Sequence, residues 1–142
     1  EVKNNQRMII PVFGNGDINS PEKARIMRDE YGLDGAMIGR TTIGNPWFFK
    51  EVKQYLKNGE TIEPPSIGQR ITTAKRHLEM AIKWKGERLG LLETRRHYSN
   101  YFKGVPDFKP YRTRLVTCDA IDDIMDVFQE LESKKETFEL IV

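Results

Sequence analysis

Two short apolar runs dominate the first part of the chain. The first covers residues 8–13 and stops at Gly14, and the second covers residues 34–38 and stops at Gly39. Near-continuous apolar strands joined by a helix are typical of a parallel sheet covered on both faces. The pattern therefore predicts two consecutive strand–loop units of one α/β layer. Their glycine-bearing loops emerge at the same, carboxyl end of neighbouring strands, where α/β proteins place ligands.

Helix signals lie between and after these strands. Ser20 is placed to cap a helix that Gly32 ends with a left-handed turn. Asn45 is placed to cap a second helix with Pro46 at its first position, and Gly59 follows its last residue. These signals predict one helix between the strands and another after them.

A proline-containing linker separates this part from a wholly helical one. Residues 60–68 include consecutive prolines, which cannot continue a helix. We place a domain boundary there, with domains at residues 1–59 and 60–142. The second domain is predicted to be an all-α bundle. Its expected helices are a long one from residue 66 that Gly86 and Gly90 interrupt, and others over residues 91–103, residues 111–116 and from a cap at Asp119 onward.

Two strands are too few for the doubly covered sheet that their composition implies. We therefore expect the carboxyl-terminal part of a longer barrel or open sheet, which is mostly helical as a fragment. The alternative is a small α+β domain in which the two strands belong to a local sheet. Exposed strand edges favour self-association of such a fragment.

Composition narrows the class of protein. The 142 residues hold one cysteine, which excludes an internal disulfide framework and a cysteine-rich zinc site. There is no apolar run near the roughly 18 residues of a membrane span, and the chain starts with polar residues, unlike a signal peptide. A cytoplasmic protein is the economical interpretation. His77 and His97 have no partners at metal-ligand spacing, so no metal site is predicted.

Charge is distributed unevenly along the chain. Residues 61–118 carry 12 Lys and Arg against 5 Asp and Glu, whereas residues 119–142 carry 2 against 8. A basic stretch followed by an acidic one is informative about which partners the protein binds, and it says little about the fold. The basic residues can form a phosphate-tracking face, with Tyr98, Tyr101 or Tyr111 stacking on bases. The alternative is an ordinary solvated helical surface whose tyrosines belong to the core.

A candidate phosphate site lies in the two glycine-bearing loops. Asn15, Gly16 and Asp17 follow the first strand, and Gly39 and Arg40 follow the second. Glycine lets backbone amides approach a phosphate closely, and an arginine adds a charge-assisted contact. In eight-stranded α/β barrels, the loops after strands seven and eight commonly build this site. The alternative is that the glycines serve only tight turns and that the arginine is solvated.

Three blocks of sequence carry a resemblance to a known family. Residues 10–18, 34–40 and 44–49 (IPVFGNGDI, DGAMIGR and GNPWFF) resemble, in order and spacing, the closing strands of tRNA-dihydrouridine synthases. The later residues Arg96-His97, Tyr101, Lys103-Gly104, Pro106 and 112–115 are similar to the helical tRNA-binding domain of that family.

The resemblance implies a TIM barrel, that is a (β/α)8 barrel, which holds FMN and is followed by a helical tRNA-binding domain. It implies that flavin reduces uridine in tRNA and that NADPH re-reduces the flavin. The residues expected to hold FMN are Asn15, Gly16, Asp17, Gly39 and Arg40, and those expected to contact RNA are Arg95, Arg96, His97, Lys103, Arg112 and Arg114.

The proton donor of that family is a cysteine in an earlier part of the barrel. Cys118 lies in the helical part and is not assigned this role. No catalytic residue is therefore predicted here, and we expect the fragment alone to be inactive. Two other functions fit the pattern: a phosphate-binding barrel enzyme of another class, or a stand-alone RNA-binding helical module.

Overall fold

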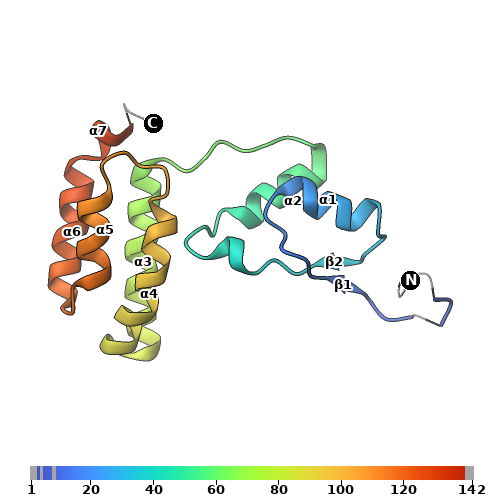
Figure 1. Cartoon of the computed structure of the whole chain (residues 1–142), viewed down its shortest axis with the longest axis horizontal. Coiled ribbons are helices and arrows are strands. Elements are labelled where there is room, and N and C mark those ends of the chain that lie inside the picture. Colours follow the sequence, from blue (N-terminus) through green and yellow to red (C-terminus); the bar gives the residue numbers. More distant parts are fainter. Residues whose placement is uncertain (1–2, 4, 8, 140–142) are drawn as a thin grey trace. The chain divides into compact units, whose positions relative to one another are not determined.

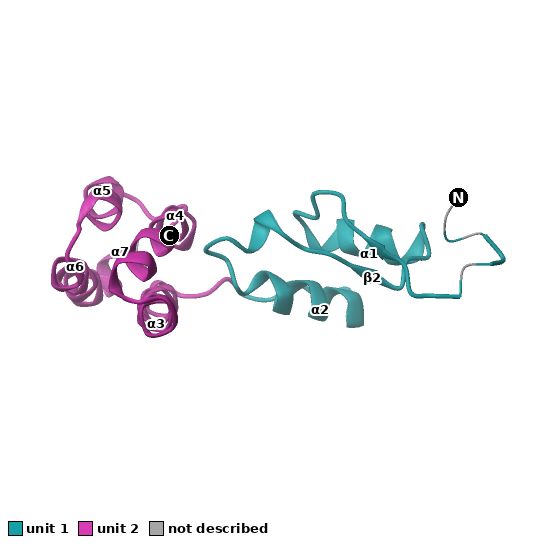
Figure 2. Ribbon diagram, turned by 90° about the horizontal axis from the view of Figure 1, so that it is seen from below, with its two compact units in different colours: residues 1–63 teal, residues 64–142 magenta. Residues whose placement is uncertain are grey.

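The computed structural model describes residues 3, 5–7 and 9–139. The chain divides into two compact units, residues 1–63 (unit 1) and residues 64–142 (unit 2), shown in different colours in Figure 2. The division falls within the linker that the sequence predicts. No helix among the described residues is both long and apolar enough to cross a membrane.

Unit 1 contains a short parallel sheet. Strands β1 (Phe13–Gly14) and β2 (Gly35–Ala36) pair with Phe13 opposite Gly35 and Gly14 opposite Ala36. The strands predicted over residues 8–13 and 34–38 are longer than those observed, and residue 8 lies outside the described residues. Pro11 has no N–H group to donate, and within the described part of the chain each strand pairs with a single neighbour, so the hydrogen-bonded ladder is brief.

Helix α1 (Pro21–Asp29) lies between the strands in sequence, and helix α2 (Phe48–Asn58) follows them. The Ser20 hydroxyl accepts a hydrogen bond from the amide of Lys23 at 3.3 Å, as a helix cap does. Gly59 has φ of 76° at the end of α2, a left-handed conformation that glycine adopts without strain. The prediction that Asn45 caps α2 was wrong, because the helix begins later and its cap position is Trp47.

A small core holds unit 1 together. Its buried residues come from the loop after β1 and from both helices: Ile18, Ala24, Phe48 and Val52. Helices α1 and α2 lie on the same side of the strands (Figure 1). Several apolar side chains of the strand segments are exposed, namely Ile9, Ile10, Phe13 and Met37. Unit 1 therefore has an apolar surface that its own helices do not cover.

Unit 2 is a helical bundle, as predicted. Its helices are α3 (Ile67–Lys85), α4 (Glu87–Tyr101), α5 (Lys109–Thr117), α6 (Ile121–Ser133) and α7 (Lys135–Glu139). Helix α4 packs on α3 and α5, and α6 packs on the same two helices and on α7. Seen along their axes, α4 and α6 occupy opposite corners of the bundle (Figure 2).

Helix α3 begins with a capping box. The Ser66 hydroxyl accepts from the amide of Gln69 at 3.2 Å, and the Gln69 side chain accepts from the amide of Ser66 at 3.0 Å. The predicted cap of α6 was wrong, since Ala120 occupies that position and Asp119 pairs with Arg95 instead.

Gly90 does not interrupt a helix, contrary to the prediction. It lies inside α4, where a Cβ atom would stand only 2.6 Å from the backbone nitrogen of Ile82 in α3. The residue is therefore a contact point at which the two helix backbones approach closely. Gly86, with φ of 82°, provides the turn between α3 and α4, as the sequence predicts.

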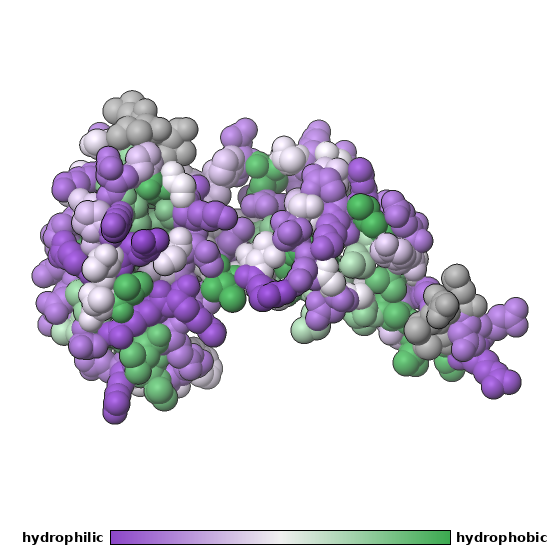
Figure 3. Space-filling view, viewed as in Figure 1, coloured by the Kyte–Doolittle hydropathy of each residue, from purple (hydrophilic) through white to green (hydrophobic). Residues whose placement is uncertain are grey.

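The core of unit 2 is formed by one apolar face of each long helix. The fully buried side chains include Ile71, Leu78, Tyr98, Leu115, Ile124, Val127 and Leu131. Apolar side chains are also exposed near the turn between α3 and α4, namely Met80, Trp84, Leu89 and Leu92. Figure 3 shows an apolar patch at that end of the hairpin, surrounded by hydrophilic atoms.

Candidate functional site

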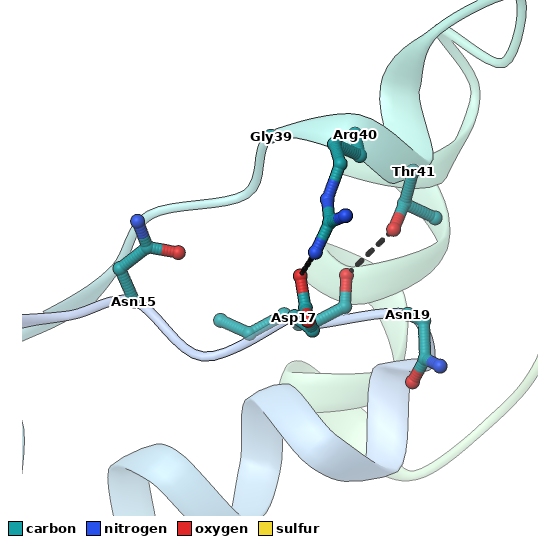
Figure 4. Close-up of a pocket in the computed structure, with 7 residues that line it drawn as sticks. Asn15, Asp17, Asn19, Gly39, Arg40 and Thr41 are labelled. Carbon is teal, nitrogen blue, oxygen red and sulfur yellow. Dashed lines mark hydrogen bonds and ion pairs between the residues drawn. The ribbon is translucent and has the colours of Figure 1, made fainter.

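Two loops at the carboxyl ends of the strands of unit 1 face each other across an open hollow. The hollow has a volume of about 600 Å³, which is within the usual size of small-molecule sites, about 300–1,000 Å³. The loop after β1 and the loop after β2 both contribute to its wall (Figure 4), and the lining residues are Asn15, Asp17, Ile18, Asn19, Gly39, Arg40 and Thr41.

Two side-chain contacts connect these loops. The Arg40 guanidinium donates a hydrogen bond to the Asp17 carboxylate and forms an ion pair with it (Figure 4). The Thr41 hydroxyl donates to the carbonyl oxygen of Ile18 at 2.8 Å. Both contacts join the segment after β1 to the segment after β2, so the two loops form one structural element.

Two cations, Arg40 and Lys23, and one carboxylate, Asp17, determine the charge at this site. The hydrogen bond from Arg40, together with its charge, holds the pKa of Asp17 below the usual value, and the charge of Lys23 acts in the same direction. The Lys23 ammonium group also donates to the backbone oxygen of Asp17 at 2.8 Å. Two cations, Arg40 and Lys23, therefore contact the loop after β1, and the Asp17 carboxylate accepts a hydrogen bond from Arg40.

Backbone geometry makes the hollow suitable for an anion. Asp17 has φ of 48°, in the left-handed region, which turns the chain sharply after Gly16. A Cβ atom at Gly39 would have no neighbour within 4 Å, so a ligand can approach that backbone closely. The amides of Gly16 and Gly39 donate no hydrogen bond to any other described residue. The site thus combines available amides with an arginine, which are the groups that bind phosphate.

The structure brings the predicted cofactor-binding residues together. Asn15, Asp17, Gly39 and Arg40 line the hollow, and Gly16 lies in the same loop without lining it. Sequence reasoning missed Ile18, Asn19 and Thr41 as lining residues. Their adjacency to the predicted positions was the available signal, because a loop that binds a ligand contributes consecutive residues.

Two of the predicted RNA-binding arginines bind other groups of unit 2. Arg95 donates to the carbonyl oxygen of Cys118 and to the carboxylate of Asp119, both at 2.7 Å. Arg114 donates to both carboxylate oxygens of Glu130 at 2.8 Å. These arginines connect α4 and α5 to the acidic end of the chain, and their charges are largely compensated there.

The other predicted RNA-binding residues lie nearer to solvent. Arg96, Lys103 and Arg112 are exposed, and His97 is half-buried. The backbone oxygen of Lys103 accepts a hydrogen bond from Arg70 at 3.1 Å.

The interpretation that Tyr98 or Tyr101 stacks on bases was wrong. Tyr98 is 1% exposed and Tyr101 is 5% exposed, so both rings belong to the core. Tyr111 is partly exposed, and its ring contacts Phe138 and receives the Lys134 ammonium group.

The charges of unit 2 are distributed unevenly among its helices. Residues 67–101, which form α3 and α4, carry 8 basic and 3 acidic residues, whereas α6 carries 5 acidic residues and no basic one. Helix α4 occupies the corner opposite α6 (Figure 2), whereas α3, which carries five of the eight basic residues, packs directly on α6. No group of three or more His, Cys, Asp or Glu residues in the described part of the chain is arranged to hold a metal ion.

Comparison with known proteins decides the family. The family model for dihydrouridine synthase (Dus) matches residues 1–137. The chain belongs to the dihydrouridine synthase family. A tRNA-dihydrouridine synthase B from Pseudomonas putida is 37% identical over 118 residues, which cover 83% of this chain and 34% of the relative. A tRNA-dihydrouridine synthase B from Xanthomonas axonopodis is 41% identical over 114 residues, or 78% of this chain and 34% of the relative.

A further relative is the probable tRNA-dihydrouridine synthase 1 from Synechocystis, which is 34% identical over 125 residues. That match covers 88% of this chain and 35% of the relative. The chain thus spans about a third of the length of the curated dihydrouridine synthases that it matches. The resemblance drawn from the three sequence blocks is confirmed at the level of the family.

Proposed function

We propose that the chain is part of an FMN-dependent tRNA-dihydrouridine synthase, which reduces uridine in tRNA to dihydrouridine with NADPH as the reductant. Family membership over residues 1–137 supports the reaction. The observation that carries the proposal is the hollow in which the Arg40 guanidinium and two glycine-bearing loops meet at the carboxyl ends of adjacent parallel strands. This combination suits the phosphate end of FMN.

In this proposal, unit 1 supplies the last two strand–helix units of a (β/α)8 barrel. Its strands are parallel, and the connecting helix α1 packs on β2, as in a β–α–β unit. The exposed apolar side chains of Ile10, Phe13 and Met37 need a cover in a stable protein. The other strands of a barrel provide that cover, and they also close the sheet edges.

The residues of the hollow fit the phosphate group of FMN. Arg40 is placed to donate to phosphate oxygens, and Gly39 lets the backbone approach them without a side chain in the way. Lys23 adds a second positive charge next to the loop after β1. When bound, FMN supplies the hydride for the uracil ring. The role of these residues is to hold its anionic end at the barrel rim.

In the same proposal, unit 2 binds tRNA through its basic helices. The excess of basic residues on α3 and α4 attracts a polyanion, and the acidic α6, which lies opposite α4, repels it. Contacts to phosphates and to RNA shape are expected to dominate binding, because the base edges of an RNA helix are poorly accessible to side chains. The target uracil must also leave its stack to reach a flavin.

The proposal is tested with the complete protein that contains this chain. The protein is incubated with a tRNA transcript and NADPH, and dihydrouridine is quantified by mass spectrometry of the digested RNA. We expect a yellow flavoprotein that converts uridine to dihydrouridine only when NADPH is present. A complete protein that binds no flavin and leaves the uridines unchanged would refute the proposal.

A further inference from the structure

Two histidines form an unusual cluster between α3 and α4. The rings of His77 and His97 meet edge to face with centroids 4.6 Å apart, and the Tyr101 hydroxyl lies 3.2 Å from Nδ1 of His77. On the other side of the cluster, Nε of Arg96 donates a hydrogen bond to Nε2 of His97 at 3.3 Å. A continuous series of contacts therefore connects the buried Tyr101 to the exposed Arg96.

The hydrogen bond from Arg96 fixes the state of the His97 ring. A guanidinium group can only donate, so Nε2 of His97 must be unprotonated, and the ring proton of the neutral form is on Nδ1. Desolvation, followed by the electrostatic interaction with His77 and the charge of Arg96, lowers the pKa of His97 to about 4, against an opposing effect of Glu93. Burial and the charges of Arg96 and Lys85 also lower the pKa of His77. Both rings are neutral at physiological pH.

This arrangement determines which part of Arg96 is available. Its Nε atom is engaged by His97, and its side chain forms no other hydrogen bond or ion pair with the described residues. The two terminal nitrogen atoms of the guanidinium group retain their four N–H donors in one plane. The nearby charges are Lys85 and Glu93, which pair with each other, so the cation at position 96 is not cancelled by an ion pair of its own.

Arg96 also lies on the favourable side of unit 2. It belongs to α4, which occupies the corner opposite the acidic α6 (Figure 2). The adjacent Arg95 pairs with Asp119 instead. Two consecutive arginines therefore have different environments, one tied to a carboxylate and one oriented by a neutral ring.

We propose that Arg96 is a pre-oriented contact for a phosphate group of bound RNA and that His97 is the positioning residue that sets the plane of its guanidinium group. The ring of His77 packs against His97, and the Tyr101 hydroxyl contacts His77 in turn. The inference rests on the proposed binding of tRNA by unit 2 and deepens it, because it separates one phosphate-binding arginine from the structural arginines Arg95 and Arg114. A planar guanidinium with one edge fixed loses less conformational entropy when it binds a phosphate through its free edge.

The test compares four variants of the full 142-residue chain: Arg96→Gln, His97→Leu, His97→Gln and Arg88→Gln. Arg88→Gln is the control, since this exposed arginine is also on α4 and its replacement changes the charge equally. Binding to a fluorescent tRNA transcript is measured by anisotropy at several salt concentrations. Circular dichroism verifies that each variant retains its helices.

We expect Arg96→Gln to reduce the slope of log affinity against log salt by about 0.7–0.9, the range for one lost phosphate contact between single-stranded nucleic acid and duplex DNA. His97→Leu should weaken binding by about three- to tenfold with the slope unchanged, since the charge remains and only its orientation is lost. His97→Gln retains an acceptor near the position of Nε2 and should restore most of the affinity. A purely structural role for His97 would not produce this rescue.

Two results would overturn the inference and are distinguishable. If the native chain binds tRNA with a steep salt dependence but Arg96→Gln behaves like Arg88→Gln, the assignment of Arg96 is wrong and RNA binding by unit 2 remains. If the native chain shows no salt-dependent binding to tRNA, the proposed RNA-binding function of unit 2 fails, and the inference fails with it.

Discussion

The contact between α3 and α4 at Gly90 allows a quantitative test of the helical bundle. A Cβ atom at this position would stand 2.6 Å from the nitrogen of Ile82, 2.7 Å from the carbonyl carbon of Ala81 and 2.8 Å from the Cα atom of Ile82. All three are backbone atoms, which cannot rotate away as a side chain does. To reach ordinary contact distance, the two helices must separate by about 1 Å, which weakens the dispersion contacts along their interface.

The substitution Gly90→Ala should therefore destabilise the protein. Overpacking costs about 1–3 kcal/mol, and the upper part of that range applies because backbone meets backbone. Alanine has a better helix propensity than glycine by about 1 kcal/mol, which offsets part of the loss. We expect a net decrease of about 2 kcal/mol in the free energy of unfolding, measured by urea denaturation of the full chain and followed by far-ultraviolet circular dichroism.

Gly68→Ala is the matched control. Gly68 lies in the first turn of α3, where a Cβ atom would have only ordinary contacts, the nearest at 3.8 Å. The same chemical change there should raise the free energy of unfolding by up to about 1 kcal/mol. If Gly90→Ala is as stable as Gly68→Ala, the close approach of α3 and α4 is not present, and the packing described for unit 2 is wrong.

Three further predictions concern single contacts and the chain as a whole. Arg95→Ala should lower the free energy of unfolding by about 1–2 kcal/mol, because the carbonyl of Cys118 loses a charged donor, whereas Arg88→Ala should have little effect in the same urea assay. Arg40 lowers the pKa of Asp17, so their ion pair contributes stability above the usual carboxylate range and is lost as the pH falls through the lowered pKa. Arg40→Gln should raise the pKa of Asp17 in an NMR titration of its carboxyl group. The 142-residue chain alone should form no dihydrouridine in tRNA, and turnover by the purified chain would contradict the proposed division of the enzyme.

Local signals predicted the elements that depend on neighbouring residues in sequence. Ser20 caps α1, Gly59 ends α2 in a left-handed turn and Gly86 separates α3 from α4. Each outcome depends on φ values or on a hydrogen bond across three residues, so a short stretch of sequence contains the information.

Features that depend on tertiary contacts could not be predicted in this way. Glycine often interrupts helices, but Gly90 lies inside α4, where its missing side chain allows the backbone of α3 to approach closely. Asp119 has the chemistry of a helix cap, but Arg95 from another helix engages it. In both cases, a contact with a residue distant in sequence overrides the local conformational preference, and the local sequence pattern does not indicate that contact.

The candidate site lies between these two cases. The residues around Asp17 and Arg40 were predicted to lie at the same edge because parallel strands place their carboxyl ends together, and the hollow forms there. The hydrogen bond that the Thr41 hydroxyl donates to the carbonyl oxygen of Ile18 was not predicted, because it depends on how far each loop extends beyond its strand.

The central claim is that the hollow at Arg40 holds the phosphate group of FMN, and comparing FMN with riboflavin tests it most directly. The affinities of the complete protein and of its Arg40→Gln variant are measured for both ligands by quenching of flavin fluorescence. Riboflavin lacks the phosphate, so we expect Arg40→Gln to weaken FMN binding about tenfold or more and to leave riboflavin binding unchanged. Equal affinity of the two proteins for FMN, or an equal loss for both ligands, would contradict the account.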